Sequence, residues 1–162
     1  MTVVSTTKDP EAQRFTIVAD LAASPDRVWQ IWADARQLER WWGPPTWPAT
    51  FTRHEMAVGG VSEYYMTGPE GEKAHGWWET VAVESPRTFE FDDGFADENG
   101  DRDATMPVTR ALVELEATPD GTRMSITSQF ASAEHMEQLT NMGMVEGMTE
   151  AMGQIDAILA QA

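Results

Sequence analysis

The chain has 162 residues, no cysteine, and 27 acidic against 11 basic side chains, which gives a formal net charge of −16. This length suits a single domain, and a hydrophobic fraction of 41% predicts a folded chain rather than a disordered one. The acidic charge disfavours nucleic acid and anionic membrane surfaces as partners, and the lack of cysteine excludes disulfides, thiol catalysis and thiolate metal sites. Because the sequence has neither an apolar run of ~20 residues nor a visible signal peptide, we expect a cytoplasmic protein.

The first part of the chain predicts a polar, flexible lead-in over residues 1–12, followed by one domain over residues 13–162. Apolar alternation over residues 14–21 predicts the first strand. Ser24-Pro25-Asp26 then has the composition of a helix start, and Asp34 has that of the cap of a second short helix. Gly43-Pro44-Pro45 would end this helical region.

From residue 47 to 130 the apolar pattern changes to a period of two, which is typical of strands. We expect six strands, near residues 48–56, 60–67, 73–83, 87–92, 108–117 and 122–130. The short Gly- and Pro-containing separators favour an antiparallel meander. Alternation predicts the side chains that face inward: Tyr64, Met66, Trp77, Val81, Val83, Phe89, Phe91, Ala111, Val113, Leu115, Met124, Ile126 and Phe130.

The end of the chain has a helical pattern from Ser132 to about Leu159, with a continuous helix expected over residues 143–159. An apolar stripe lies on one face of this helix and includes Met144, Met148 and Met152. This stripe must cover an apolar surface, and the concave side of the sheet is the large candidate.

Four stretches of the sequence carry a resemblance to a known family. They are Ser24–Trp29, Leu38–Pro44 with its Arg-Trp-Trp-Gly-Pro string, Gly59–Gly71, and Gly121–Thr127. In this order they resemble the SRPBCC superfamily, whose helix-grip fold also occurs in START domains and the birch-pollen allergen. The closer resemblance is to the family named after activators of the 90-kDa heat-shock protein ATPase. It implies an α+β fold with a seven-stranded antiparallel sheet around a long C-terminal helix and a cavity between them.

The family contains binding proteins, polyketide cyclases and dehydratases, and a chaperone co-factor domain, so the resemblance leaves the function open. Our leading interpretation is that the internal cavity binds a small hydrophobic or aromatic molecule, without a cofactor. The expected lining residues are Trp32, Trp41, Tyr64, Met66, Trp77, Phe89, Phe91, Val113, Met144, Met148 and Met152. The alternative for these side chains is an ordinary filled core.

A second interpretation is an enzyme of the cyclase or dehydratase type. His75 and Glu79 share one face of a strand, and if that face were concave they could act as an acid–base pair. The alternative is a polar pair that faces water. A chaperone-interaction module is a weaker third interpretation, and a homodimer is compatible with all three.

The acidic segment from Asp92 to Asp103 is expected to be a solvated loop, with Phe95, Met106 and Pro107 available to cover the cavity opening. Its Asp97-x-Asn99-x-Asp101 string begins like a calcium loop, but Arg102 and Val108 stand where that motif needs glycine and glutamate. No other residue pattern indicates a metal site, so none is expected.

Overall fold

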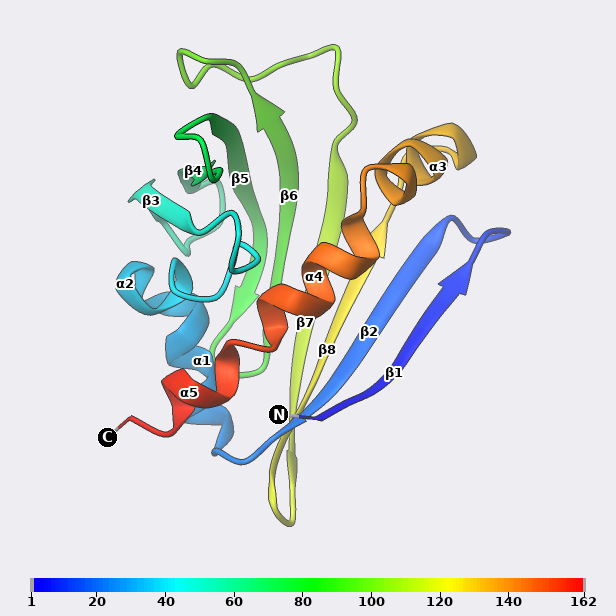
Figure 1. Ribbon diagram of the computed structural model, residues 1–162. Helices are drawn as coiled ribbons and strands as arrows, with labels where there is room; N and C mark the ends of the chain where they lie inside the picture. The colour runs from blue at the N-terminus through cyan, green and yellow to red at the C-terminus, as the bar shows by residue number, and fades with distance from the viewer. Residues whose placement is uncertain (1, 162) are drawn as a thin grey trace.

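The computed structural model describes residues 2–161, which form an α+β fold with one strongly curved antiparallel sheet and helices across its concave face (Figure 1). The sheet order is β1–β2–β8–β7–β6–β5–β4–β3. The strands are β1 (Thr2–Asp9), β2 (Arg14–Leu21), β3 (Ala49–Arg53), β4 (Val61–Thr67), β5 (Lys73–Glu84), β6 (Thr88–Ala96), β7 (Thr109–Thr118) and β8 (Gly121–Gln129). The first predicted strand and all six strands of the predicted meander are therefore confirmed.

Two short helices follow β2, as the sequence predicts: α1 (Pro25–Ala33) and α2 (Ala35–Leu38). The Ser24 hydroxyl accepts a hydrogen bond from the Arg27 amide and caps α1, while the Asp34 carboxylate caps α2. These caps satisfy amides that have no partner inside the helix. The pair places the buried side chains of Ile31, Trp32 and Leu38 in the core.

The sheet has eight strands rather than the seven that the family resemblance implies. The additional strand is β1, which pairs with β2 at the edge of the sheet, with Lys8 opposite Phe15. The sequence predicts a flexible lead-in here, because residues 4–9 lack the apolar alternation of a half-buried strand. The side chains of residues 4–9 are in fact exposed, and the strand pairs with β2 through its backbone.

The C-terminal helical region is not one continuous helix. It consists of α3 (Ala133–Asn141), α4 (Met144–Met152) and α5 (Ile155–Leu159), which run diagonally across the concave face (Figure 1). Gly143 adopts a left-handed backbone conformation with φ 87° between α3 and α4, and α4 ends at Gly153. A periodic apolar stripe survives such breaks, which is why periodicity alone predicted a single helix.

Aromatic rings fill the centre of the core. Trp32, Trp41, Trp78, Phe89 and Phe91 are at most 1% exposed. The Trp32 and Trp41 ring centroids lie 4.7 Å apart in an edge-to-face arrangement, and those of Trp78 and Phe91 lie 4.2 Å apart in a stacked one. Such ring pairs stabilise a core beyond the area they bury. These rings form a tightly packed part of the core.

Trp78, rather than Trp77, faces the core, which corrects the predicted orientation of β5. The register between β5 and β6 shifts between Thr80 and Ala82, which is the signature of a β-bulge. Strict alternation counted back from Val83 through this bulge reaches Trp77. The true inward series before the bulge is Gly76, Trp78 and Thr80, all of which are buried.

Candidate functional site

A cavity of about 300 Å³ lies between the concave face of the sheet and the α3–α4 region. Side chains from the α2–β3 connection, β4, β6, β7, β8, α3 and α4 line it, and most of them are apolar. The lining residues are Trp41, Trp42, Pro44, Tyr64, Met66, Asp93, Gly94, Phe95, Thr109, Ala111, Ile126, Ser128, Leu139, Met142, Gly143, Met144, Gly147, Met148 and Ala151. The volume is at the lower end of the range found for small-molecule sites.

Small residues keep this space open on the helical side. A Cβ atom placed on Gly143 or Gly147 would meet no other atom within 4 Å, and Ala151 and Ala111 also line the cavity. The flexible side chains of Met144 and Met148 lie beside these residues and are only partly buried, while Met142 is 56% exposed. The side of the cavity formed by α3 and α4 is therefore less densely packed than the side formed by the rings of Trp41, Trp42 and Tyr64.

Five of the predicted lining residues do line the cavity: Trp41, Tyr64, Met66, Met144 and Met148. Another five were placed correctly inside the protein but contribute to the packed core instead: Trp32, Phe89, Phe91, Val113 and Met152. The remaining residue, Trp77, lies on the outer face, where its ring sits under the Arg102 guanidinium at 3.9 Å. The predicted lining thus combined the core and the cavity, which alternation cannot separate.

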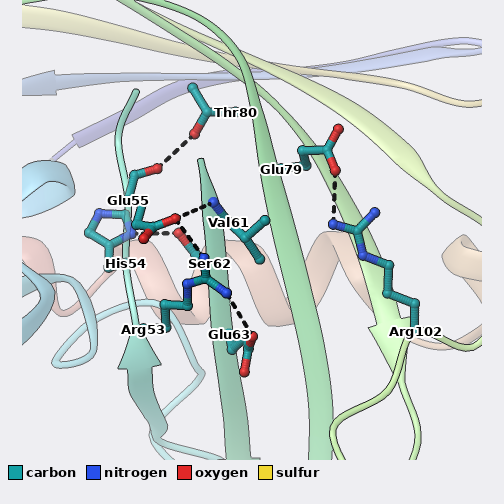
Figure 2. A network of polar contacts seen from close by, with 9 residues as sticks. All are labelled: Arg53, His54, Glu55, Val61, Ser62, Glu63, Glu79, Thr80 and Arg102. Carbon is teal, nitrogen blue, oxygen red and sulfur yellow. Dashed lines mark hydrogen bonds and ion pairs between the residues drawn. The ribbon is translucent and has the colours of Figure 1, made fainter. Parts of the chain in front are cut away.

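His75 and Glu79 do not face the cavity. They share the outer face of β5 with Trp77, and the Glu79 carboxylate accepts a 2.8 Å hydrogen bond from Arg102 (Figure 2). The His75 ring lies 5.6 Å from that of Tyr65, its cross-strand neighbour. The acid–base pair proposed from the sequence therefore has no access to the apolar space.

The polar pair that does face the cavity is Tyr64 and Asp93, and Asp93 is not among the site residues predicted from the sequence. The Tyr64 hydroxyl donates a 3.0 Å hydrogen bond to Asp93 Oδ1. Burial raises the pKa of Asp93 to about 7, although the hydrogen bond from Tyr64 and the nearby Trp78 indole oppose this rise. Burial likewise raises the pKa of Tyr64, and the neighbouring Asp93 charge adds to that effect.

A sequence signal for Asp93 existed. Phe89 and Phe91 were expected to face inward, and the same alternation continues to Asp93 and Phe95. The expected strand stopped at residue 92, because the next residues read as an acidic loop. In the structure β6 runs on to Ala96, so Asp93 keeps the inward parity of the two phenylalanines.

Two buried indole N–H groups lie near this pair without a partner at hydrogen-bond geometry, those of Trp42 and Trp78. Trp42 lines the cavity, and its ring is nearly perpendicular to that of Tyr64, with centroids 6.5 Å apart. Buried polar atoms without partners are uncommon in folded proteins. Of the two, only Trp42 lines the cavity, so the cavity has one spare hydrogen-bond donor beside the carboxyl group.

A second group of polar contacts lies at the β3–β4 edge, and Figure 2 includes its hydrogen bond between His54 and Ser62. His54 Nε2 lies 2.7 Å from the Trp32 carbonyl oxygen, which can only accept, so this nitrogen carries the proton and Nδ1 accepts from the Ser62 hydroxyl at 2.8 Å. Burial lowers the pKa of His54. Both ring nitrogens are occupied by the fold, so this histidine ties β3 and β4 to α1.

Among residues 2–161, no group of three or more His, Asp or Glu side chains is arranged to hold a metal ion. In the same range, no helix is both long and apolar enough to cross a bilayer.

A curved antiparallel sheet that wraps around C-terminal helices, with a cavity between them, defines a helix-grip domain. Residues 22–160 match the family described as activator of Hsp90 ATPase homolog 1-like protein, and the chain belongs to this family. No curated protein matches the chain.

Solved structures agree with this assignment. A protein from Arthrobacter aurescens, solved by NMR in solution, is 57% identical with a TM-score of 0.94, and the match covers 99% of this chain and 94% of that one. A crystal structure from Mycobacterium smegmatis is 43% identical with a TM-score of 0.91 and 99% coverage of both chains. The AHSA1 protein of Silicibacter pomeroyi, at 21% identity and a TM-score of 0.71 over 91% of this chain and 97% of that one, shares the fold.

Proposed function

We propose that this protein binds a small hydrophobic or aromatic molecule in the cavity between the sheet and α3–α4. The observation that carries the proposal is the cavity itself: about 300 Å³, with a mostly apolar lining and a hydrogen-bonded polar pair, Tyr64 and Asp93. Small-molecule sites combine an apolar enclosure with a few oriented polar groups in this way. The partly buried methionines would adapt to ligands of different shape.

A cyclase or dehydratase that uses His75 and Glu79 as its acid–base pair does not fit the structure, because both residues lie on the outer face. The chaperone-interaction alternative rests only on the name of the family. The cavity, in contrast, is a feature of this chain's own side chains, so binding is the function that the geometry supports best.

The proposal is tested with a neutral environment-sensitive dye, N-phenyl-1-naphthylamine, whose emission rises in apolar surroundings. We expect saturable binding to the wild type and displacement by small apolar compounds. Gly147→Leu places a side chain into the space beside Gly147 and should weaken dye binding at least tenfold. Glu150→Leu, at an exposed position on the same helix, should leave the affinity unchanged.

Equal dye affinity in wild type and Gly147→Leu would show that the dye binds elsewhere. A wild type that binds neither the dye nor any compound of an apolar panel would overturn the proposed function. Circular dichroism of both variants checks that each keeps the native fold.

A further inference from the structure

The cavity contains a carboxyl group that no basic side chain of the lining neutralises. Of the residues that line it, only Asp93 and Tyr64 titrate, and none is basic. The arginines on the neighbouring strand and loop are engaged elsewhere: Arg110 with Asp92, and Arg102 with Glu79. An ionised Asp93 therefore faces an apolar space with a hydrogen bond from Tyr64 and the Trp78 indole nearby, and with no opposite charge among the lining residues. A partly buried carboxylate in this state lacks the opposite charge that would offset its desolvation.

The walls around Asp93 are aromatic. The side chains of Trp41, Trp42, Tyr64 and Phe95 all line the same cavity. The face of an aromatic ring attracts a cation, and several rings around one space form the kind of enclosure that recognises alkylated ammonium groups. A carboxylate and aromatic faces favour the same type of ligand group, namely one with a positive charge and an apolar body.

We propose that the cavity is selective for a protonated amine on a small aromatic or aliphatic body, with Asp93 accepting hydrogen bonds from the ammonium group. This inference rests on the proposed function and names its ligand class. The net charge of −16 acts in the same direction, because it raises the local concentration of cations and repels anions such as fatty acids. A neutral ligand would leave the carboxylate without an opposite charge.

The test uses three compounds of nearly the same shape: 1-naphthylmethylamine, 1-naphthylmethanol and 1-naphthoic acid. Their affinities are measured by calorimetry at pH 8 in 0.15 M salt, which screens long-range attraction. We expect the amine to bind at least tenfold more tightly than the alcohol, and the acid to bind most weakly.

Two neighbouring carboxylates provide matched variants. Asp93→Asn removes the anionic acceptor, so the ratio of amine to alcohol affinity should fall to about one. Asp92 points to the outer face and pairs with Arg110, so Asp92→Asn should keep the wild-type ratio. If the ratio of amine to alcohol affinity falls to about one in both variants, the preference comes from the overall charge of the protein, and the inference is wrong.

A pH series on the wild type tests the same idea without a substitution. The pKa of Asp93 is about 7 and that of the amine is higher, so the affinity ratio should decline as the pH falls through 7 and Asp93 takes up a proton. The other groups that face Asp93 keep their charge here. Tyr64 remains neutral, while the cross-strand neighbours Trp78 and Thr109 and the helical residues of the lining carry no charge. Tyr64→Phe removes a hydrogen bond that lowers the Asp93 pKa. In this variant Asp93 should take up its proton at higher pH, so the affinity ratio should start to decline at higher pH as well.

The outcomes separate the two proposals. If the dye and the alcohol bind but the amine has no advantage at pH 8, the selectivity inference is wrong and the proposed function stands. If none of the three compounds and no dye binds, both are wrong. If Asp93→Asn does not fold, the wild-type pH series decides: a ratio that stays constant between pH 5 and pH 8 would overturn the inference.

Discussion

Asp92 and Asp93 are adjacent in the sequence and experience opposite surroundings. Asp92 forms an ion pair with Arg110 on the outer face of β6, whereas Asp93 shares the cavity with Tyr64. Burial raises the pKa of Asp93 to about 7. One step along a strand thus decides whether a carboxylate is a solvated surface group or a candidate binding residue.

The raised pKa of Asp93 predicts a specific pH dependence of stability. In the fold this carboxyl has a pKa of about 7, against an ordinary value of 3.8. The folded state therefore binds more protons than the unfolded state between these values, so its ionisation destabilises the protein as the pH rises from about 4 to about 7. The full effect is at most about 4 kcal/mol, because one pKa unit corresponds to about 1.4 kcal/mol, and water that reaches the cavity reduces it.

The measurement is the free energy of unfolding by urea at a series of pH values, compared with Asp93→Asn. Asparagine keeps an acceptor for the Tyr64 hydroxyl and cannot ionise, so the variant should gain on the wild type as the pH rises through this window. Its advantage should be constant above pH 8. A difference that stays flat from pH 4 to pH 8 would mean that the Asp93 pKa is not raised.

Residue-level predictions from the sequence succeeded where the alternation was uninterrupted. The inward positions of Tyr64, Phe89, Phe91 and Val113 are confirmed by their burial. The prediction of an inward side chain was wrong at Trp77, because a bulge adds one residue to β5 and nothing in the apolar pattern marks this bulge. A count of alternating residues is reliable only as far as the next bulge.

At the level of elements, the α3–α4–α5 region depends on glycines with different roles. Gly143 has a positive φ and separates two helices, whereas Gly147 lies within α4. The same type of residue is thus required at one position and merely tolerated at the other.

This contrast predicts opposite effects of two alanine substitutions. Gly143→Ala forces a Cβ into the left-handed region and should lower the free energy of unfolding by about 1 kcal/mol. Gly147→Ala meets no atom within 4 Å and improves helix propensity, so it should raise this free energy by up to about 1 kcal/mol. Thermal and urea unfolding of the two variants check the signs. A gain in stability for Gly143→Ala would contradict the conformational role assigned to that glycine.

The elements themselves were largely predictable, because seven strands and two short helices have strong local signals. The edge strand β1 was not, since a strand with exposed side chains leaves no apolar pattern. The helix breaks were not either, since the stripe from Met144 through Met152 to Leu159 continues past Gly153 at nearly constant spacing. The cavity was foreseen only as a property of the family. Which side chains line it depends on how far α4 stands from the sheet, and the sequence does not encode this distance in any local pattern.

The whole molecule carries a large excess of negative charge, which predicts that salt stabilises it. At a net charge of −16 the acidic groups repel one another more in the compact state than in the unfolded chain. Raising sodium chloride from 10 to 300 mM shortens the screening length from about 30 Å to below 10 Å. We expect the Tm to rise by several degrees. A lower Tm at high salt would mean that surface ion pairs such as Arg123–Asp20 outweigh the overall repulsion.

The packing of the tryptophans has an optical consequence. Trp42 contacts the cavity, and its ring centroid lies 5.6 Å from that of Trp41 and 4.8 Å from that of Trp78, which in turn lies 6.2 Å from Trp32. At such separations, excitation absorbed by one indole migrates among the others before it is emitted. A ligand that quenches Trp42 would therefore lower the combined emission of Trp32, Trp41, Trp42 and Trp78. The intrinsic fluorescence of the protein is thus a sensitive measure of contact between a ligand and Trp42.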